Sequence, residues 1–184
     1  MNDLGNSAQE QVSLRIVARW AAEFVAEAID IFEAYLPHDT RPRDALRAAL
    51  AFAEGKNRSN ELRAIGMAAL KAGKDVDKPP HYAARAATLL AAVAYTHTDL
   101  RDGTQGVRQA QHILGPVVYA ALAGEADADN NPAVSEAIVQ RAVHNAPPEV
   151  RHLLRHFPPQ PPGKNRPGTL FHTLDSSLRT ELAA

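Results

Sequence analysis

The chain has 184 residues, contains no cysteine and carries a formal net charge of −1. Its length suits one domain, and a chain of this size can bury roughly 70% of its unfolded surface without disulfides or metals. The absence of cysteine excludes disulfides, thiolate zinc sites and cysteine nucleophiles. The nearly neutral charge argues against a dedicated nucleic-acid-binding protein, which usually has a strongly basic domain.

Neither a targeting signal nor a membrane span is expected. The N-terminus lacks the basic segment and apolar run that make up a secretory signal. The most apolar stretch, residues 83–97, is interrupted by Arg85 and is shorter than the roughly 20 residues that a membrane span needs. We therefore expect a cytoplasmic protein that does not act at a membrane.

Charge is spread unevenly along the chain. Residues 1–40 have a net charge of −5, and residues 41–74 have a net charge of +5. The basic block lacks the interleaved aromatic residues of a nucleic-acid-binding surface, so we expect its arginines to be solvated or to pair with the acidic block. The acidic candidates are Glu23, Glu27, Asp30 and Glu33.

The first part of the chain predicts three helices, because its apolar residues recur with helical spacing and not with a period of two. The first covers residues 8–36 and has one apolar face. The second has Pro42 in its first turn, where a missing N–H is tolerated, and Gly55 just after its end. The third covers residues 60–72.

Two longer, more central helices follow. The fourth opens at Pro79 and Pro80 and extends to about Tyr95 or Thr98. It is apolar almost all round, which predicts a position at the centre of a bundle. The fifth covers residues 103–125.

The last part of the chain predicts shorter helices separated by prolines. A sixth helix begins at Pro132, and a short seventh lies within residues 145–159. Residues 158–168 form a proline- and glycine-rich strap, which we expect to be an extended tie between two packed helices. A final helix carries Leu170, Leu174, Leu178 and Leu182. The whole chain, 1–184, is therefore predicted to be a single all-α domain, a compact bundle of seven to eight helices.

The fifth helix breaks a local rule. Pro116 has no N–H to donate to the carbonyl of His112, so the helix should kink or break there, at a cost of about 3 kcal/mol. One unpaired carbonyl would then lie beside one imidazole. Opposite the apolar face of this helix lies a polar stripe made up of Gln105, Arg108, His112 and Tyr119.

Together with His97, this stripe is our candidate binding site. His97 and Asp99 lie just before the fifth helix and could approach His112 if the fourth and fifth helices form a hairpin. No nucleophile accompanies them at a telling spacing, so no catalytic residue is assigned. The favoured alternatives are a solvated polar surface on the helix and a loop capped by Asp99 and Asp102.

No metal or cofactor site is expected. His152 and His156 have the i, i+4 spacing of zinc-binding helices, but Leu153 stands where a catalytic glutamate would follow the first histidine. No third ligand is evident nearby. A glycine-rich phosphate-binding loop and a nucleophile elbow are also missing from the sequence.

Three fragments of the chain resemble a known family. They are "RPRDALRAALAFAEG", "TQGVRQAQHILGPVVYAALAGE" and "VRHLLRHFPPQPPGKNRPGTLFHTLDSSLR". The family is an all-helical group of small bacterial proteins, common in actinobacteria, whose members are described as immunity proteins of polymorphic toxin systems. The likeness extends from the first helix to the final "LDSSLR" and depends on helix-packing motifs, not on catalytic ones.

The resemblance also assigns positions. The family's histidine-bearing hairpin corresponds to Tyr95, His97, Gln105 and His112, and its arginine-proline start corresponds to 41–43. The insert "KDVDKPPHY" departs from the family pattern. Some members carry an exonuclease-subunit label, but the Gly-Lys loop and the Cys-x-x-Cys hook expected of such a subunit are missing from this sequence.

The resemblance implies a non-enzymatic protein that binds a cognate toxin and covers its active site or holds it inactive. Acidic patches on the first helix or in residues 125–131 would suit a basic nuclease toxin and speed encounter. The alternative hypothesis is a small-molecule-binding or hydrolytic protein, with a pocket on the order of several hundred Å³ near His112 and Pro116. A third hypothesis is a protein that assembles with copies of itself, for instance as a homodimer.

Overall fold

The computed structural model describes residues 8–180, and over these residues the protein is all-helical, as predicted. The α-helices are α1 (Ala8–Tyr35), α2 (Arg41–Ala53), α3 (Asn60–Ala72), α4 (Lys78–Ala92), α5 (Gly103–Asp127), α6 (Pro132–His144), α7 (Pro148–Leu154) and α8 (Arg166–Thr180). A short 3₁₀ helix, η1 (Val93–Tyr95), follows α4 directly. None of the helices described is long and apolar enough to span a bilayer.

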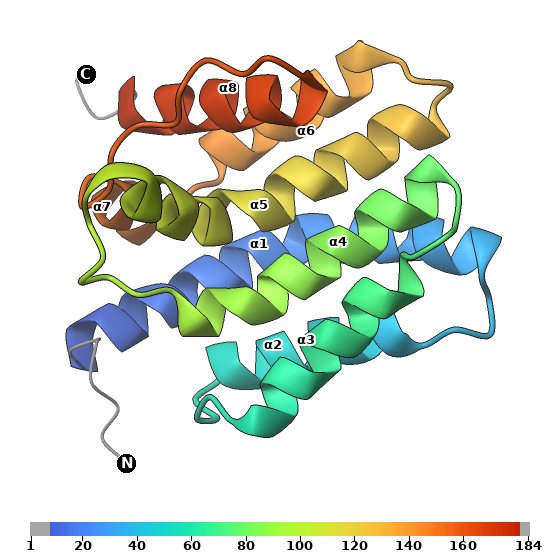
Figure 1. Ribbon diagram of the computed structural model, residues 1–184, viewed down its shortest axis with the longest axis horizontal. Coiled ribbons are helices and arrows are strands. Elements are labelled where there is room, and N and C mark those ends of the chain that lie inside the picture. Colours follow the sequence, from blue (N-terminus) through green and yellow to red (C-terminus); the bar gives the residue numbers. More distant parts are fainter. Residues whose placement is uncertain (1–7, 181–184) are drawn as a thin grey trace.

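The helices form two layers (Figure 1). Helices α3, α4, α5 and α8 lie side by side nearer the viewer, and α2, α1 and α6 lie behind them. The centre is the pair α4 and α5, and α4 also packs against α1, α2 and α3. This central position of α4 follows from its alanine-rich, nearly all-round apolar surface, which lets neighbouring helices approach closely.

Small residues set the spacing of the central helices. A Cβ placed on Gly66 of α3 would lie 3.0 Å from the Cβ of Ala91 in α4. A Cβ on Gly115 of α5 would lie 2.7 Å from the Cδ1 of Leu89 in α4. The absence of side chains at these glycines therefore lets α3 and α5 pack closely against α4.

Most helices begin or end close to the proline and glycine residues that predicted their bounds. Gly55 follows α2 with φ +120°, a conformation that favours glycine. The Ser59 hydroxyl accepts a hydrogen bond from the Leu62 N–H at 3.3 Å and caps α3. Helix α8 differs from the prediction: it begins at Arg166, so the last three residues of the expected strap form its first turn, where Pro167 is tolerated. The predicted Leu182 lies outside the described residues.

The remaining strap is hydrogen-bonded to the helices on either side of it. Gln160 is buried, and its backbone N–H donates to Asp175 Oδ2 in α8 at 2.8 Å. Its side-chain amide donates to the carbonyl of Val107 in α5 at 3.0 Å. Asp175 is fully buried and also accepts a hydrogen bond from Arg179 at 2.9 Å. The segment therefore ties α5 to α8.

Much of the acidic charge of α1 is paired within the fold. Arg43 of α2 reaches Asp30 at 2.7 Å and Glu33 at 2.6 Å. Its hydrogen bonds lower the pKa of Glu33. Glu27 pairs with Arg141 of α6 at 2.5 Å. The predicted attraction between the first acidic block and the following basic block is thus confirmed for Arg43.

Candidate functional site

Helix α5 continues through Pro116, so of the kink or break that was predicted there, a break does not occur. Residues 113–118 are all buried between neighbouring helices. Tertiary packing on this segment offsets the missing hydrogen bond, which local rules alone would treat as a helix end. Pro116 is therefore a packed residue of the central helix.

His112 does not lie on an open, solvated surface. Its side chain is half-buried, and its Nδ1 atom is shielded from solvent without a hydrogen-bond partner among the described residues. Burial lowers the pKa of His112, and the charge of His97 lowers it further. The imidazole is consequently favoured in its neutral form.

The loop before α5 brings His97 towards His112, as the predicted hairpin required. The His97 backbone N–H donates to Gln109 Oε1 of α5 at 2.8 Å, which holds the loop against the helix. His97 Nδ1 lies 3.8 Å from Asp99 Oδ1. This arrangement places two imidazoles near one another, with an exposed carboxylate beside one of them.

The other candidate residues lie along α5 on either side of His112. Gln105 and Arg108 are exposed on the first turns of α5. Tyr119 belongs to a ring cluster that joins three helices: its ring centroid is 6.1 Å from that of Tyr82 in α4 and 6.1 Å from that of Phe171 in α8. Of the five predicted residues, Tyr119 is thus part of the packing between α4, α5 and α8.

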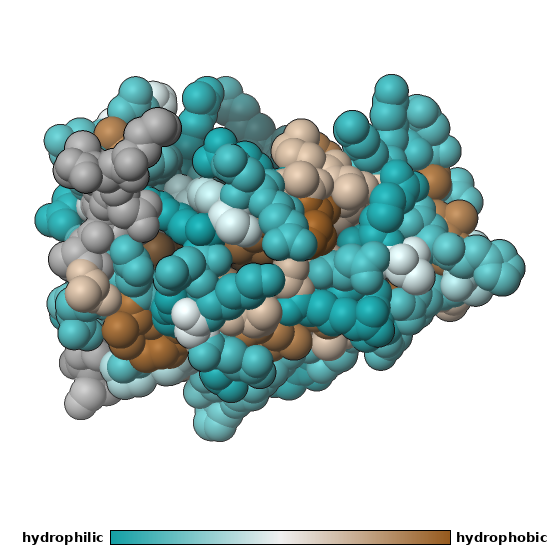
Figure 2. Space-filling model, turned by 90° about the horizontal axis from the view of Figure 1, so that it is seen from below, coloured by the Kyte–Doolittle hydropathy of each residue, from teal (hydrophilic) through white to brown (hydrophobic). Residues whose placement is uncertain are grey.

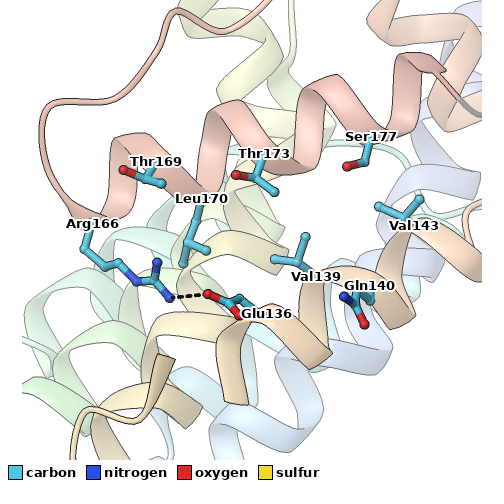
Figure 3. Close-up of a pocket in the computed structure, with 9 residues that line it drawn as sticks. All are labelled: Glu136, Val139, Gln140, Val143, Arg166, Thr169, Leu170, Thr173 and Ser177. Carbon is cyan, nitrogen blue, oxygen red and sulfur yellow. Dashed lines mark ion pairs between the residues drawn. The ribbon is translucent and has the colours of Figure 1, made fainter. Parts of the chain in front are cut away.

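A cavity that the sequence analysis missed lies between α6 and α8 (Figure 3). Its volume is about 450 Å³. The α8 wall presents hydroxyl groups at every fourth residue, and the α6 wall has valines facing them. The hydroxyl residues are Thr169, Thr173 and Ser177, and the valines are Val139 and Val143. The four-residue spacing of hydroxyls was the available sequence signal.

Arg166 closes one end of this cavity but is engaged in the fold. Its guanidinium contacts Glu125 at 2.7 Å and the Ser135 hydroxyl at 2.7 Å, and it lies 3.9 Å from Glu136. Burial alone would raise the pKa of Glu125, but hydrogen bonds from Arg166 and Ser135 outweigh it and leave the pKa lowered. This cluster joins α5, α6 and α8 and explains why the cavity offers hydroxyls and apolar surface more than free charge.

A second groove runs between α3 and α4, with a volume of about 310 Å³. Its lining is largely apolar, and Met67 beside it is 49% exposed. The Arg63 guanidinium lies 4.7 Å from the centroid of the Tyr95 ring, a cation–π geometry. The Tyr95 hydroxyl donates to the Ser59 carbonyl at 2.5 Å, which fixes the ring at the groove's end.

His152 of α7 and His156, just after the end of that helix, lie beside a further cleft. The rings of His152 and His156 are 5.0 Å apart, and Glu10 and Glu149 line the same cleft of about 320 Å³. Burial lowers the pKa of His156, and the charges of Arg101 and His152 add to the effect. Within residues 8–180, no group of three or more His, Cys, Asp or Glu side chains is arranged to hold a metal ion.

Comparison with protein families identifies a match over residues 7–102, more than half of the chain, to the model described as Imm-5 like putative immunity protein. The chain belongs to this family. Comparisons with curated proteins and with solved structures gave no match. The matched part of this Imm-5 like chain contains His97 and the groove between α3 and α4, whereas α5 and the cavity between α6 and α8 lie beyond it.

Proposed function

We propose that this chain is a cytoplasmic immunity protein that neutralises a cognate toxin by binding it, without catalysing a reaction. The observation that carries the proposal is membership of the Imm-5 like family. A binding protein of this kind covers the toxin's active site or holds the toxin in an inactive conformation. A stable interface of that type buries about 800 Å² on each partner, with aromatic and arginine residues as anchors.

The ion pairs formed within this chain bear on the charge of a partner that it could bind. The acidic residues of α1 were candidates for contacting a basic nuclease toxin, but three of them pair with arginines: Glu27, Asp30 and Glu33. In the last turn of α5, Asp127 accepts a hydrogen bond from Tyr35, and Glu125 is held by Arg166. These pairings reduce the negative charge that is available to steer a basic partner.

Co-expression with the toxin domain encoded beside the gene tests this proposal. We expect cells that express the toxin alone to stop growing and cells that express both proteins to grow. A 1:1 complex should be recovered when the two proteins are purified together. The proposal fails if no toxin is encoded nearby and no partner is captured, or if a neighbouring toxin kills cells with and without this chain.

A second candidate function, small-molecule binding or hydrolysis, is favoured by one observation at His112. Its shielded Nδ1 has no partner among the described residues, and His97 lies near it. If this imidazole takes part in binding, His112→Ala abolishes ligand-induced thermal stabilisation or turnover while the chain stays folded. His144→Ala, at an exposed position of α6, is the control. Equal ligand responses in both variants would rule the site out.

A further inference from the structure

The groove between α3 and α4 has a shape suited to receiving one side chain. Gly66 has no side chain there, so the buried Ala91 forms part of an apolar floor. Met67 stands half-exposed at the edge. Seen from the side on which α2 and α3 lie, hydrophobic residues reach the surface in patches between hydrophilic ones (Figure 2). The floor is therefore apolar and accessible.

Arg63 lines this groove and Arg85 lies on the neighbouring exposed face of α4, where it reaches towards α5, and each is stacked on a tyrosine. Arg63 lies over the Tyr95 ring and Arg85 lies over the Tyr119 ring, both at 4.7 Å from the centroid. Among residues 8–180, neither guanidinium forms an ion pair, whereas Arg43 pairs with two carboxylates. Stacking limits the mobility of these cations without neutralising them, which is favourable for contact with a carboxylate.

Arg85 and the groove share one exposed strip of α4. Thr88, Ala92 and Tyr95 line the groove, and Arg85 lies one turn before Thr88 on the same side of the helix. All four are exposed or half-buried. We name this surface the basic groove; it comprises Arg63, Met67, Arg85, Thr88, Ala92 and Tyr95. It lies within the part of the chain that matches the immunity family.

We propose that the basic groove is the surface on which the toxin docks, through an acidic segment that also inserts one apolar side chain between α3 and α4. This inference depends on the proposed function and names its surface. Charge complementarity selects the occupant: Arg63 and Arg85 remain open to carboxylates, and the floor accepts an apolar group. In a symmetric pair of copies, the same surface would face itself and bring the arginines together, which disfavours self-association.

The test measures the affinity of the purified chain for the toxin domain encoded beside its gene, with calorimetry as the readout. Arg63→Glu with Arg85→Glu reverses both charges, and we expect binding to weaken by about thirtyfold or more. The matched control is Arg19→Glu with Arg155→Glu, which makes the same change in net charge at two exposed positions outside the groove. The control should bind within about threefold of the parent chain.

Met67→Ala separates the apolar contribution from charge. Because Met67 is exposed, the truncation should leave the thermal midpoint unchanged and weaken toxin binding about tenfold. Thermal denaturation is recorded for every variant. If the double glutamate variant is unstable, Arg63→Gln with Arg85→Gln replaces it, and a loss of affinity in that folded variant supports the inference equally.

The outcomes distinguish the surface from the function. If the parent chain protects cells and both variant pairs bind equally, the basic groove is overturned while the immunity function stands. If the parent chain neither binds nor protects, both fail. A parent dimer on gel filtration that the groove variant alone dissociates assigns the groove to self-association and overturns the inference. The inference is also overturned if the parent chain binds a labelled single-stranded oligonucleotide and the groove variant does not.

Discussion

His112 shows how one side chain departs from what its helix pattern predicts. Opposite an apolar stripe, helical periodicity places a residue in solvent. Here α5 packs against α1, α4, α6 and α8, and the preceding loop brings His97 close. The periodicity of a helix shows which side chains share a face, but it does not show how many other helices pack around that helix. The approach of His97 was predictable from the expected hairpin; the burial of His112 and the clustering of Tyr119 with Phe171 were not.

The lowered pKa of His112 predicts a pH-dependent stability. The unfolded chain binds a proton at this ring near the ordinary pKa of 6.5, whereas the folded chain does so only at lower pH. The stabilisation that comes from a neutral His112 is therefore fully present above about pH 6.5, and the free energy of unfolding decreases as the pH falls below that value. In urea titrations from pH 7.5 to 5.5, His112→Gln should flatten this decrease, and the exposed His144→Gln should not. An unchanged slope in His112→Gln would refute the assignment.

Asp175 predicts a larger effect because it is a fully buried carboxylate with two partners. Asp175→Ala leaves the Gln160 N–H and the Arg179 guanidinium without their acceptor. We expect a loss of about 2–3 kcal/mol in the free energy of unfolding, measured by urea denaturation. Asp175→Asn keeps the shape and one acceptor, so its loss should be smaller; equal losses would show that neither shape nor a single acceptor is enough and that the charged carboxylate is required.

At the level of elements, proline and glycine predicted where most helices begin and end. Helix α3 has the predicted bounds, and Gly55 ends α2 with its positive φ. The two exceptions have a common cause. Pro116 and Pro167 were interpreted from local backbone rules, but one is enclosed by neighbouring helices and the other occupies the first turn of α8. A proline permits more than one backbone conformation, and the packing around it determines which of them forms.

Gly106 tests the contact between elements. A Cβ there would lie 2.5 Å from the Arg101 carbonyl and 2.6 Å from Pro158 Cδ, so the loop and the strap must move away from α5. Gly106→Ala should therefore destabilise the chain by about 2 kcal/mol, despite the better helix propensity of alanine. Gly124→Ala, which meets only the side-chain ends of Ile138 and Val134, should cost less in thermal denaturation. The reverse order would contradict this packing.

At the scale of the whole molecule, charge and family membership lead to one account. The net charge is −1, yet acidic residues of α1 form ion pairs within the fold, while two tyrosine-stacked arginines form none: Arg63 in an apolar groove and Arg85 on the adjoining face of α4. The all-α class and the immunity resemblance were available from sequence. The groove was not, because it forms where α3 and α4 meet and where the guanidinium of Arg63 in α3 stacks on the ring of Tyr95 after α4.

The most direct test of this account is a titration of the toxin's activity in vitro with the purified chain. An occluding partner removes activity in proportion to the amount added, so we predict a linear loss that reaches completion at one chain per toxin. A chain that inactivates many toxin molecules per copy would be an enzyme, and a chain without effect at excess would not be an immunity protein. Either result would contradict the account.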